Sequence, residues 1–70
     1  MPDMQMVDSS TIESVGYDVA TRELLVQFVG SKLYAYLDVD EYIFQELLIA
    51  DSKGSYFNRE IKPRYQHEIR

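Results

Sequence analysis

The spacing of the apolar residues changes near residue 38, and this change constrains the fold more than any other feature of the chain. Over residues 24–28, every second side chain is apolar, which is typical of a strand with one buried face. Beyond residue 40, the apolar residues recur at helical spacing and form one stripe: Ile43, Phe44, Leu47 and Leu48. The chain therefore predicts strands first and helices second.

Three segments before the change have strand character, namely residues 12–19, 24–28 and 33–37. The connections between them are short, so neighbouring strands must run antiparallel and form a meander. Gly16 lies inside the first segment, where a glycine often marks a β-bulge. Gly30 and Ser31 form the hairpin between the second and third segments.

The apolar stripe predicts a first helix over about residues 40–50, and Asp38 and Glu41 have the spacing of a capping box at its start. Ser52 is a good N-cap for a second, shorter helix. Pro63 ends this helix, because the residue before a proline is kept out of the helical conformation. Three of its side chains are expected to face inward: Tyr56, Phe57 and Ile61.

We therefore expect an α+β fold, in which a three-stranded antiparallel meander is followed by two helices packed on one face (β-β-β-α-α). Residues 9–66 form the single domain, residues 1–8 a frayed N-terminus and residues 67–70 a mobile C-terminus. A chain of 70 residues has a thin core. It has no cysteine, so neither disulfides nor thiolate-bound metals reinforce that core.

The first ten residues lack the basic and apolar stretches of a signal peptide, and no apolar run approaches the ~20 residues of a membrane span. We expect a cytoplasmic protein with no membrane contact. The net charge of −5 is unevenly spread, with −8 on residues 1–51 and +3 on residues 52–70. The basic C-terminal quarter suggests an anionic partner, although an ordinary solvated surface is the simpler interpretation.

Several short motifs follow one another in order: Ser9-Ser10, Gly16-Tyr17-Asp18, Leu24-x-Val26-x-Phe28, Tyr34-x-Tyr36, Ser52-Lys53-Gly54-x-Tyr56-Phe57-Asn58, Ile61 and Tyr65. In this order and spacing they resemble the KTSC domain family, which occurs at the C-terminus of some lysyl-tRNA synthetases and as small free-standing bacterial proteins. The sequence departs from the family at Asp40, where a proline is common after Val39. The resemblance implies no established activity, and the family's presence on tRNA synthetases suggests RNA binding by association alone.

The residues that could carry catalysis do not combine into a catalytic set. His67 is the only histidine, and Ser9 and Ser10 have no evident base partner. No spacing of histidines or carboxylates suits a metal ion, and the glycines are too far apart for a phosphate-binding loop. We therefore expect no enzyme, no cofactor and no small-molecule substrate.

Segment 52–65 is the strongest candidate for contact with RNA or another anion. Lys53 would stand at the start of the second helix, where an anionic partner could relieve the conflict between its charge and the helix dipole. The candidate residues are Lys53, Asn58, Arg59, Lys62, Arg64 and Tyr65. The first hypothesis is thus a non-catalytic module associated with RNA or tRNA, and the alternative is that these bases only keep the chain soluble.

Tyr34 and Tyr36 share one face of the sheet, and the length of the Gly30-Ser31 hairpin loop decides which face that is. A two-residue loop would leave both rings exposed as a platform on which bases stack. A three-residue loop would place them on the core face of the sheet. We favour the three-residue loop, because a thin core needs large rings, and we expect four family-motif rings in the core: Tyr34, Tyr36, Tyr56 and Phe57.

The three-residue loop also leaves an apolar set on the opposite face: Leu25, Val29, Leu33 and Leu37, with Gln27 and Ala35 between them. Monomers rarely expose so contiguous an apolar patch. The second hypothesis is therefore a protein-interaction or self-associating module that uses this open face of the sheet, and in the self-associating form two copies make a homodimer.

Overall fold

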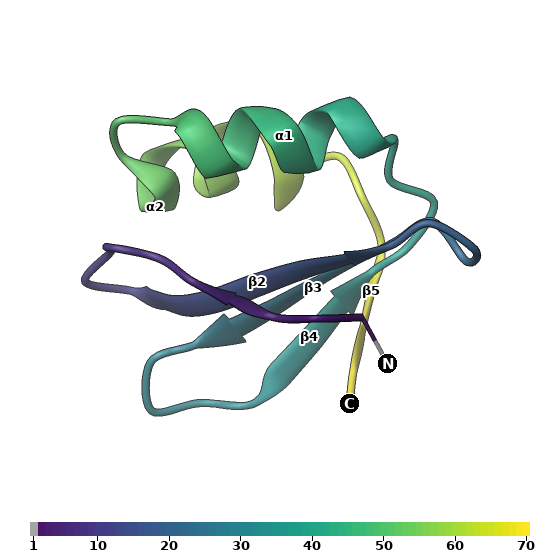
Figure 1. The fold of residues 1–70 in the computed structure, drawn as a ribbon, viewed down its shortest axis with the longest axis horizontal. Coiled ribbons are helices and arrows are strands. Elements are labelled where there is room, and N and C mark those ends of the chain that lie inside the picture. The colour runs from purple at the N-terminus through teal and green to yellow at the C-terminus, as the bar shows by residue number, and fades with distance from the viewer. Residues whose placement is uncertain (1) are drawn as a thin grey trace.

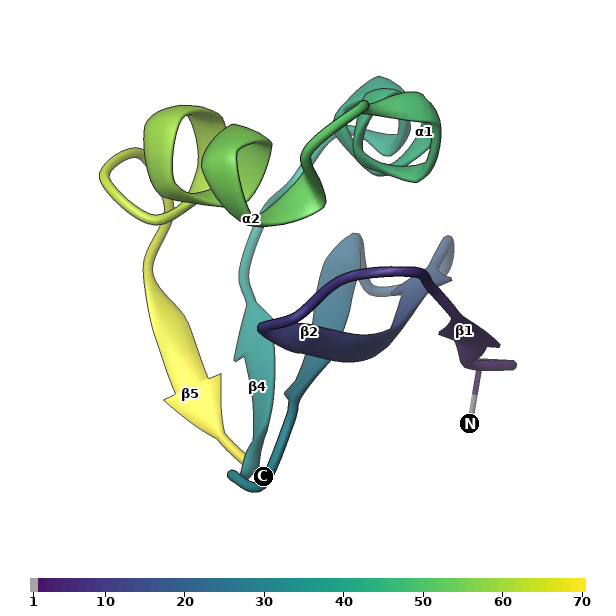
Figure 2. The same ribbon diagram turned by 90° about the vertical axis from the view of Figure 1, so that its left-hand side faces the viewer.

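The computed structural model describes residues 2–70 and contains one sheet with all the helices on one side of it (Figure 1). The sheet has five antiparallel strands. Seen from the side, the helices lie next to each other above the sheet (Figure 2). The two-layer α+β arrangement expected from the change in apolar spacing is confirmed.

The predicted meander forms the middle of the sheet, with β2 (Ile12–Asp18), β3 (Glu23–Phe28) and β4 (Leu33–Tyr36) in sequence order. Helix α1 (Glu41–Ile49) and helix α2 (Lys53–Tyr56) follow it. Beyond α2, the helix widens into the π-helical segment η1 (Phe57–Ile61), in which Lys62 N–H donates to Phe57 O at 2.9 Å.

Two further strands lie at the edges of the sheet, β1 (Gln5–Met6) beside β2 and β5 (His67–Ile69) beside β4. The prediction of a three-stranded sheet with unpaired ends is therefore wrong. The outer strands of a meander present unpaired backbone groups that a short segment can join. Arg70 N–H donates to Leu33 O at 2.8 Å in this way.

The register of the β3–β4 hairpin confirms the three-residue loop. Leu24 pairs with Tyr36 and Val26 pairs with Tyr34, so both tyrosines lie on the face toward the helices. Gly30, in this loop, has a φ of 67°, which glycine adopts without strain.

The start of α1 differs from the prediction. Its N-cap is Asp40, whose side chain forms no capping hydrogen bond, so the predicted capping box of Asp38 and Glu41 is wrong. The carboxylate of Asp38 is occupied elsewhere, because it pairs with the Arg22 guanidinium at 3.1 Å. The predicted N-cap of α2 is confirmed, since Ser52 Oγ accepts a hydrogen bond from Ser55 N–H at 3.3 Å.

Gly16 does not form the predicted bulge. It pairs regularly with Leu25, and the irregularity of β2 lies between Ile12 and Ser14. The glycine makes room for the N-terminal segment, because a Cβ at this position would lie 2.7 Å from Met4 Sδ and 2.9 Å from the backbone oxygen of Asp3.

The core lies between the sheet and the helices. Tyr36, Tyr56 and Phe57 are buried in it, as predicted, and Tyr34 packs half-buried against it. The remaining members come from the meander, the β4–α1 connection and the inward faces of the helices: Ile12, Val15, Leu24, Val26, Val39, Ile43, Phe44, Leu47 and Ile61.

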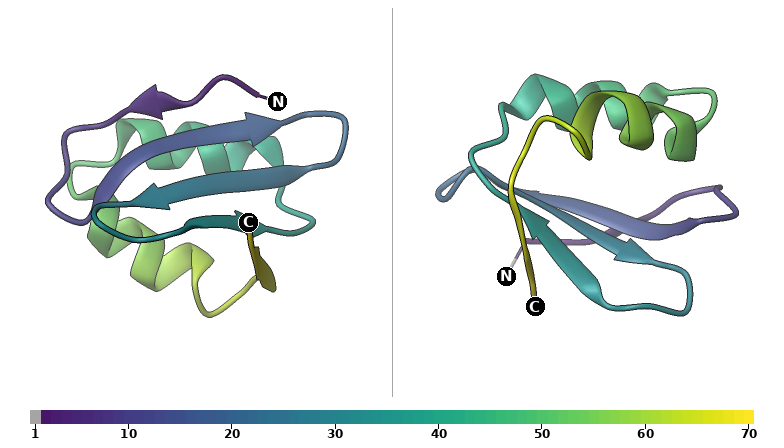
Figure 3. Two further views of the ribbon diagram at one scale, coloured as in Figure 1. Left: turned by 90° about the horizontal axis from the view of Figure 1, so that it is seen from below. Right: turned by 180° about the vertical axis from the view of Figure 1, so that it is seen from behind.

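The opposite face of the sheet carries no helix (Figure 3), yet it is not the exposed apolar patch that was predicted. Leu25 is 5% exposed and Ala35 0%, Leu33 and Leu37 are half-buried, and only Val29 is exposed, at 54%. Residues from the two ends of the chain cover part of this face. Pro2 and Arg70 border a cavity of about 240 Å³ together with Leu25 and Leu33. Arg70 Nη2 also pairs with Glu23 Oε2 at 2.6 Å.

Candidate functional site

The six predicted anion-binding residues do not form one surface. Arg59 and Arg64 both pair with Glu60, at 2.9 Å through Arg59 Nε and 3.4 Å through Arg64 Nη2. The Arg59 guanidinium also lies 5.7 Å from the centre of the Tyr56 ring. The two arginines thus share one carboxylate, which offsets part of their charge.

Lys53 borders one cavity together with Asn58, and Tyr65 borders another together with Arg64. Lys53 Nζ donates to Ala50 O at 3.1 Å, at the C-terminal end of α1, where a cation is favourable. Tyr65 packs half-buried against the core, and this burial raises the pKa of its hydroxyl. Neither residue lies with Lys62.

Lys62 and Asn58 border a cavity of about 490 Å³ between the sheet and the η1 segment. We call this cavity the aromatic groove. It is lined by Phe28, Ser31, Tyr34, Tyr36, Phe57, Asn58, Lys62 and His67. Asn58 and Lys62, two of the six candidate residues, therefore line the same cavity as the tyrosine pair of the family motif.

The rings of the groove are packed against one another. The His67 ring lies beside both tyrosines, with its centre 5.2 Å from that of Tyr34 and 5.3 Å from that of Tyr36, and the two tyrosine rings are stacked with their centres 6.4 Å apart. Phe28 and Phe57 meet edge to face at 5.2 Å, a favourable arrangement for aromatic pairs. Burial raises the pKa of the Tyr36 hydroxyl, which keeps it neutral and able to donate a hydrogen bond.

The polar rim of the groove comes from the helical layer. Lys62 is exposed and forms no ion pair within residues 2–70. Asn58 lies in the π-helical segment, a rare geometry that is often found at functional sites. The groove thus combines flat apolar walls with an unpaired cation and an amide.

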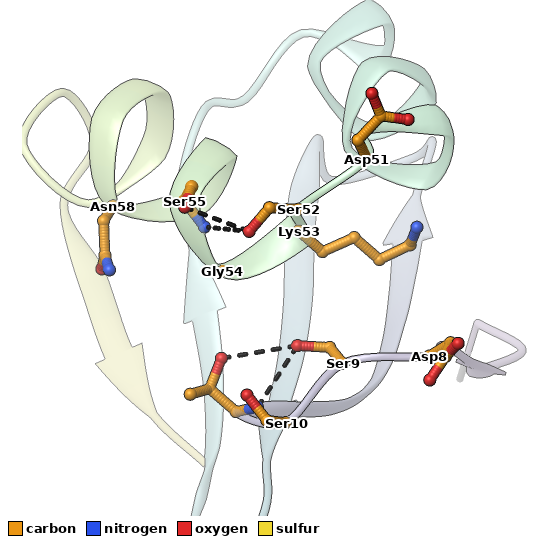
Figure 4. Close-up of a pocket in the computed structure, with 10 residues that line it drawn as sticks. Asp8, Ser9, Ser10, Asp51, Ser52, Lys53, Gly54, Ser55 and Asn58 are labelled. Atoms are coloured by element: carbon orange, nitrogen blue, oxygen red, sulfur yellow. Dashed lines mark hydrogen bonds between the residues drawn. The ribbon is translucent and has the colours of Figure 1, made fainter.

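A second cavity of about 410 Å³ lies next to the groove and is lined mainly by hydroxyl and carboxylate side chains (Figure 4). Ser9 and Ser10 stand on one side of it and Ser52 and Ser55 on the other, so two of the family motifs come together here. Ser9 Oγ accepts from Ile12 N–H at 3.2 Å, and Ser52 caps α2, so these hydroxyls are used locally. Asn58 borders both cavities.

The groove also contains residues that the sequence analysis missed. His67 was assigned to a mobile end, and it is brought beside Tyr34 and Tyr36 by the pairing of β5 with β4. Phe28 and Ser31 were interpreted only as strand and loop residues. The alternation of His67 with Ile69 was the one available signal, and three residues are too few to establish a period.

Metal-binding clusters and membrane-spanning helices are absent from the part of the chain that the structure describes. Residues 2–70 contain no group of three or more His, Cys, Asp or Glu side chains placed to hold a metal ion. None of the helices over the same residues has the length and apolar character needed to cross a membrane.

Fold and groove together describe a small α+β domain with a ligand-sized aromatic groove, and no catalytic role is evident in residues 2–70. The model of the KTSC domain matches residues 8–65. The chain therefore belongs to the KTSC domain family, as the resemblance of its motifs indicated.

The similar proteins agree with this assignment. The crystal structure of a KTSC domain protein from Yersinia pestis superimposes with a TM-score of 0.96 at 37% identity, covering 100% of this chain and 99% of that one. A protein of Tsukamurella paurometabola is 43% identical over 90% of this chain and 94% of its own length. A lysine–tRNA ligase of Nostoc punctiforme is 31% identical over 87% of this chain, which corresponds to 11% of the ligase.

Proposed function

We propose that this domain is a non-catalytic RNA-binding module and that RNA contacts it at the aromatic groove. The observation that carries the proposal is the set of aromatic side chains beside Lys62, a cation with no ion pair in residues 2–70. Proteins bind single-stranded nucleic acid with this combination, because bases stack on rings while phosphates pair with cations.

The relatives supply a reason to consider RNA first. A segment similar to this chain forms 11% of lysine–tRNA ligases from Nostoc punctiforme and Trichormus variabilis. The name of these enzymes identifies tRNA as their substrate. A domain that holds RNA would suit that setting, and the same surface would serve in a free-standing protein.

The charge of the chain sets the expected strength of binding. With a net charge of −5 and a sequence pI of about 4.6, the body of the protein repels phosphates. Glu60 pairs with both Arg59 and Arg64 and so offsets part of the attraction that these two arginines would add. We therefore expect weak binding, supplied by the groove and Lys62 rather than by a broad basic surface.

Fluorescence anisotropy with bulk tRNA at about 50 mM and about 200 mM salt tests the proposal. Lys62→Gln should weaken binding several-fold. Arg59→Gln is the matched control, because it removes the same charge about one turn before Lys62, outside the groove and beside the carboxylate of Glu60. Its affinity should stay close to wild type.

If no binding is detected at the lower salt concentration, the proposed function is refuted. Equal losses for Lys62→Gln and Arg59→Gln would retain RNA binding but move it from the groove to a diffuse basic surface.

A further inference from the structure

On the basis of this proposed function, we propose that the aromatic groove takes one unpaired base, with a single phosphate on Lys62. The domain then selects single-stranded RNA over double-stranded RNA of the same sequence. The ligand is thus an unpaired nucleotide within an RNA chain.

The walls of the groove come from two layers of the protein. The sheet supplies Phe28, Tyr34 and His67, and the helical layer supplies Phe57 and Asn58. A ligand must enter between these layers. A base within a duplex is stacked on both faces and cannot do so, whereas an unpaired base leaves its faces free.

The groove has the depth and size for such a ligand. Tyr36 and Phe57 are buried and form its floor, while Tyr34 and Phe28 are half-buried and His67 is exposed. Tyr34, Phe28 and His67 are therefore the rings of the groove that keep surface a ligand can contact. The volume of about 490 Å³ lies within the range of pockets that hold small organic ligands, about 300–1,000 Å³.

The polar groups at the rim suit a base and one phosphate. The Asn58 amide offers a donor and an acceptor to the edge of a base, and Ser31 offers a hydroxyl. Lys62 is the lysine among the lining residues, and neither Arg59 nor Arg64 lines the groove. Recognition should therefore depend on stacking, with one phosphate neutralised.

This arrangement predicts a shallow dependence on salt. The logarithm of the affinity for a single strand falls with the logarithm of salt concentration at a slope of about −0.7 for each phosphate neutralised. One contact at Lys62 gives a slope near −0.7. Phosphate binding by all four cations of segment 52–65 would give a slope near −3, that is about −0.7 for each.

The experiment compares one labelled RNA oligonucleotide as a single strand and as a blunt duplex, by anisotropy over a series of salt concentrations. Tyr34→Leu removes a stacking ring and keeps apolar bulk, and should weaken single-strand binding about tenfold. Tyr42→Leu is its control, because Tyr42 is an exposed tyrosine on α1, outside the groove. His67→Ala, at the exposed rim, repeats the test if Tyr34→Leu does not fold.

We expect the protein to prefer the single strand by about tenfold or more. The slope of log affinity against log salt concentration should lie near −0.7, and only the groove variants should lose affinity. Equal binding of the duplex, or a slope near −3, overturns base insertion while RNA binding stands. A folded Tyr34→Leu variant that keeps wild-type affinity for the single strand would also overturn base insertion. No binding of either form overturns the proposed function as well.

Discussion

Arg22 and Asp38 are the non-glycine residues of the described chain whose φ is positive, at 61° and 57°. The β2–β3 turn, which contains Arg22, here contacts the turn between β4 and α1, which contains Asp38. Val39 N–H donates to Arg22 O at 2.9 Å, and the side chains of Arg22 and Asp38 form an ion pair. The left-handed conformation costs a non-glycine residue about 1–2 kcal/mol. The ion pair is exposed and contributes little, so backbone strain dominates the energetics of this turn.

Substitutions at Asp38 test this conclusion. Asp38→Gly should leave the free energy of unfolding within about 1 kcal/mol of wild type, because relief of strain offsets the lost ion pair and the greater freedom of the unfolded chain. Asp38→Val should destabilise by about 1–3 kcal/mol, since a β-branched residue is poorly accommodated at positive φ. Urea denaturation measures both, and equal stabilities for the two variants would refute the account.

Tyr56 links stability to alkaline pH. Its buried hydroxyl donates to Glu46 Oε1 at 2.7 Å, and burial together with this carboxylate raises the pKa of the hydroxyl well above its usual value near 10. Above that usual value the unfolded chain releases the proton and the folded chain keeps it. The stabilisation is therefore complete below about pH 10 and is lost as the pH rises further.

We expect Tyr56→Phe to lower the free energy of unfolding by about 1 kcal/mol at pH 7, through loss of the hydrogen bond. Between about pH 10 and 12, stability should fall less steeply in the variant than in the wild type. Urea denaturation across this range is the measurement. Parallel pH profiles would show that Tyr56 does not carry the linkage.

At the scale of elements, the inner part of the fold was predictable and its edges were not. The period of the apolar residues located β2 to β4 and both helices, because these segments bury their own side chains. Strands β1 and β5 are held by backbone pairing with the free edges of β2 and β4. Backbone pairing does not require alternating apolar side chains, so their own sequences carry no strand pattern. The π-helical segment was also unforeseen, since Phe57 and Ile61 have the same spacing in an α-helix.

The candidate site, too, could be predicted from the sequence only in part. Asn58 and Lys62 were named as binding candidates from the sequence, and both line the groove. Tyr34 and Tyr36, which the sequence analysis expected in the core, line it as well. Lys62 was grouped with Arg59 and Arg64, because the sign of a charge does not reveal that Glu60 lies between the two arginines. That distinction depends on side-chain placement, which the sequence pattern does not specify.

The N-cap of α2 gives a prediction at this scale. Ser52→Ala should reduce the free energy of unfolding by about 1 kcal/mol, because Ser55 N–H loses its acceptor. Ser10→Ala changes another serine beside the same cavity that caps no helix, and should have little effect. Thermal and urea unfolding compare them. Similar losses in both variants would mean that the effect comes from the cavity and not from the cap.

For the whole molecule, the decisive feature is the face of the sheet without helices. Residues from both ends of the chain reach over it, and Leu25 and Ala35 are buried within one copy. The surface on which the predicted homodimer depended is thus largely occupied. Self-association through Leu25, Val29, Leu33 and Leu37 stays a prediction, and it now requires that this cover be removed.

Deletion of residues 2–6 tests that requirement. The shortened chain loses β1 and the Met4 contact at Gly16, which should uncover Leu25 and produce concentration-dependent dimers in sedimentation experiments. Adding Leu25→Lys to the shortened chain should restore the monomer. A shortened chain that stays monomeric at high concentration would show that this face has no tendency to associate.

The groove brings together residues that are far apart in the sequence, from Phe28 in β3 to His67 in β5. Its last wall is therefore made when synthesis of the domain is almost finished. A nascent chain that ends before β5 contains the meander and the helices but has no complete groove. During translation the domain would fold most of its core before it could hold a nucleotide, so RNA binding would report that the domain is complete.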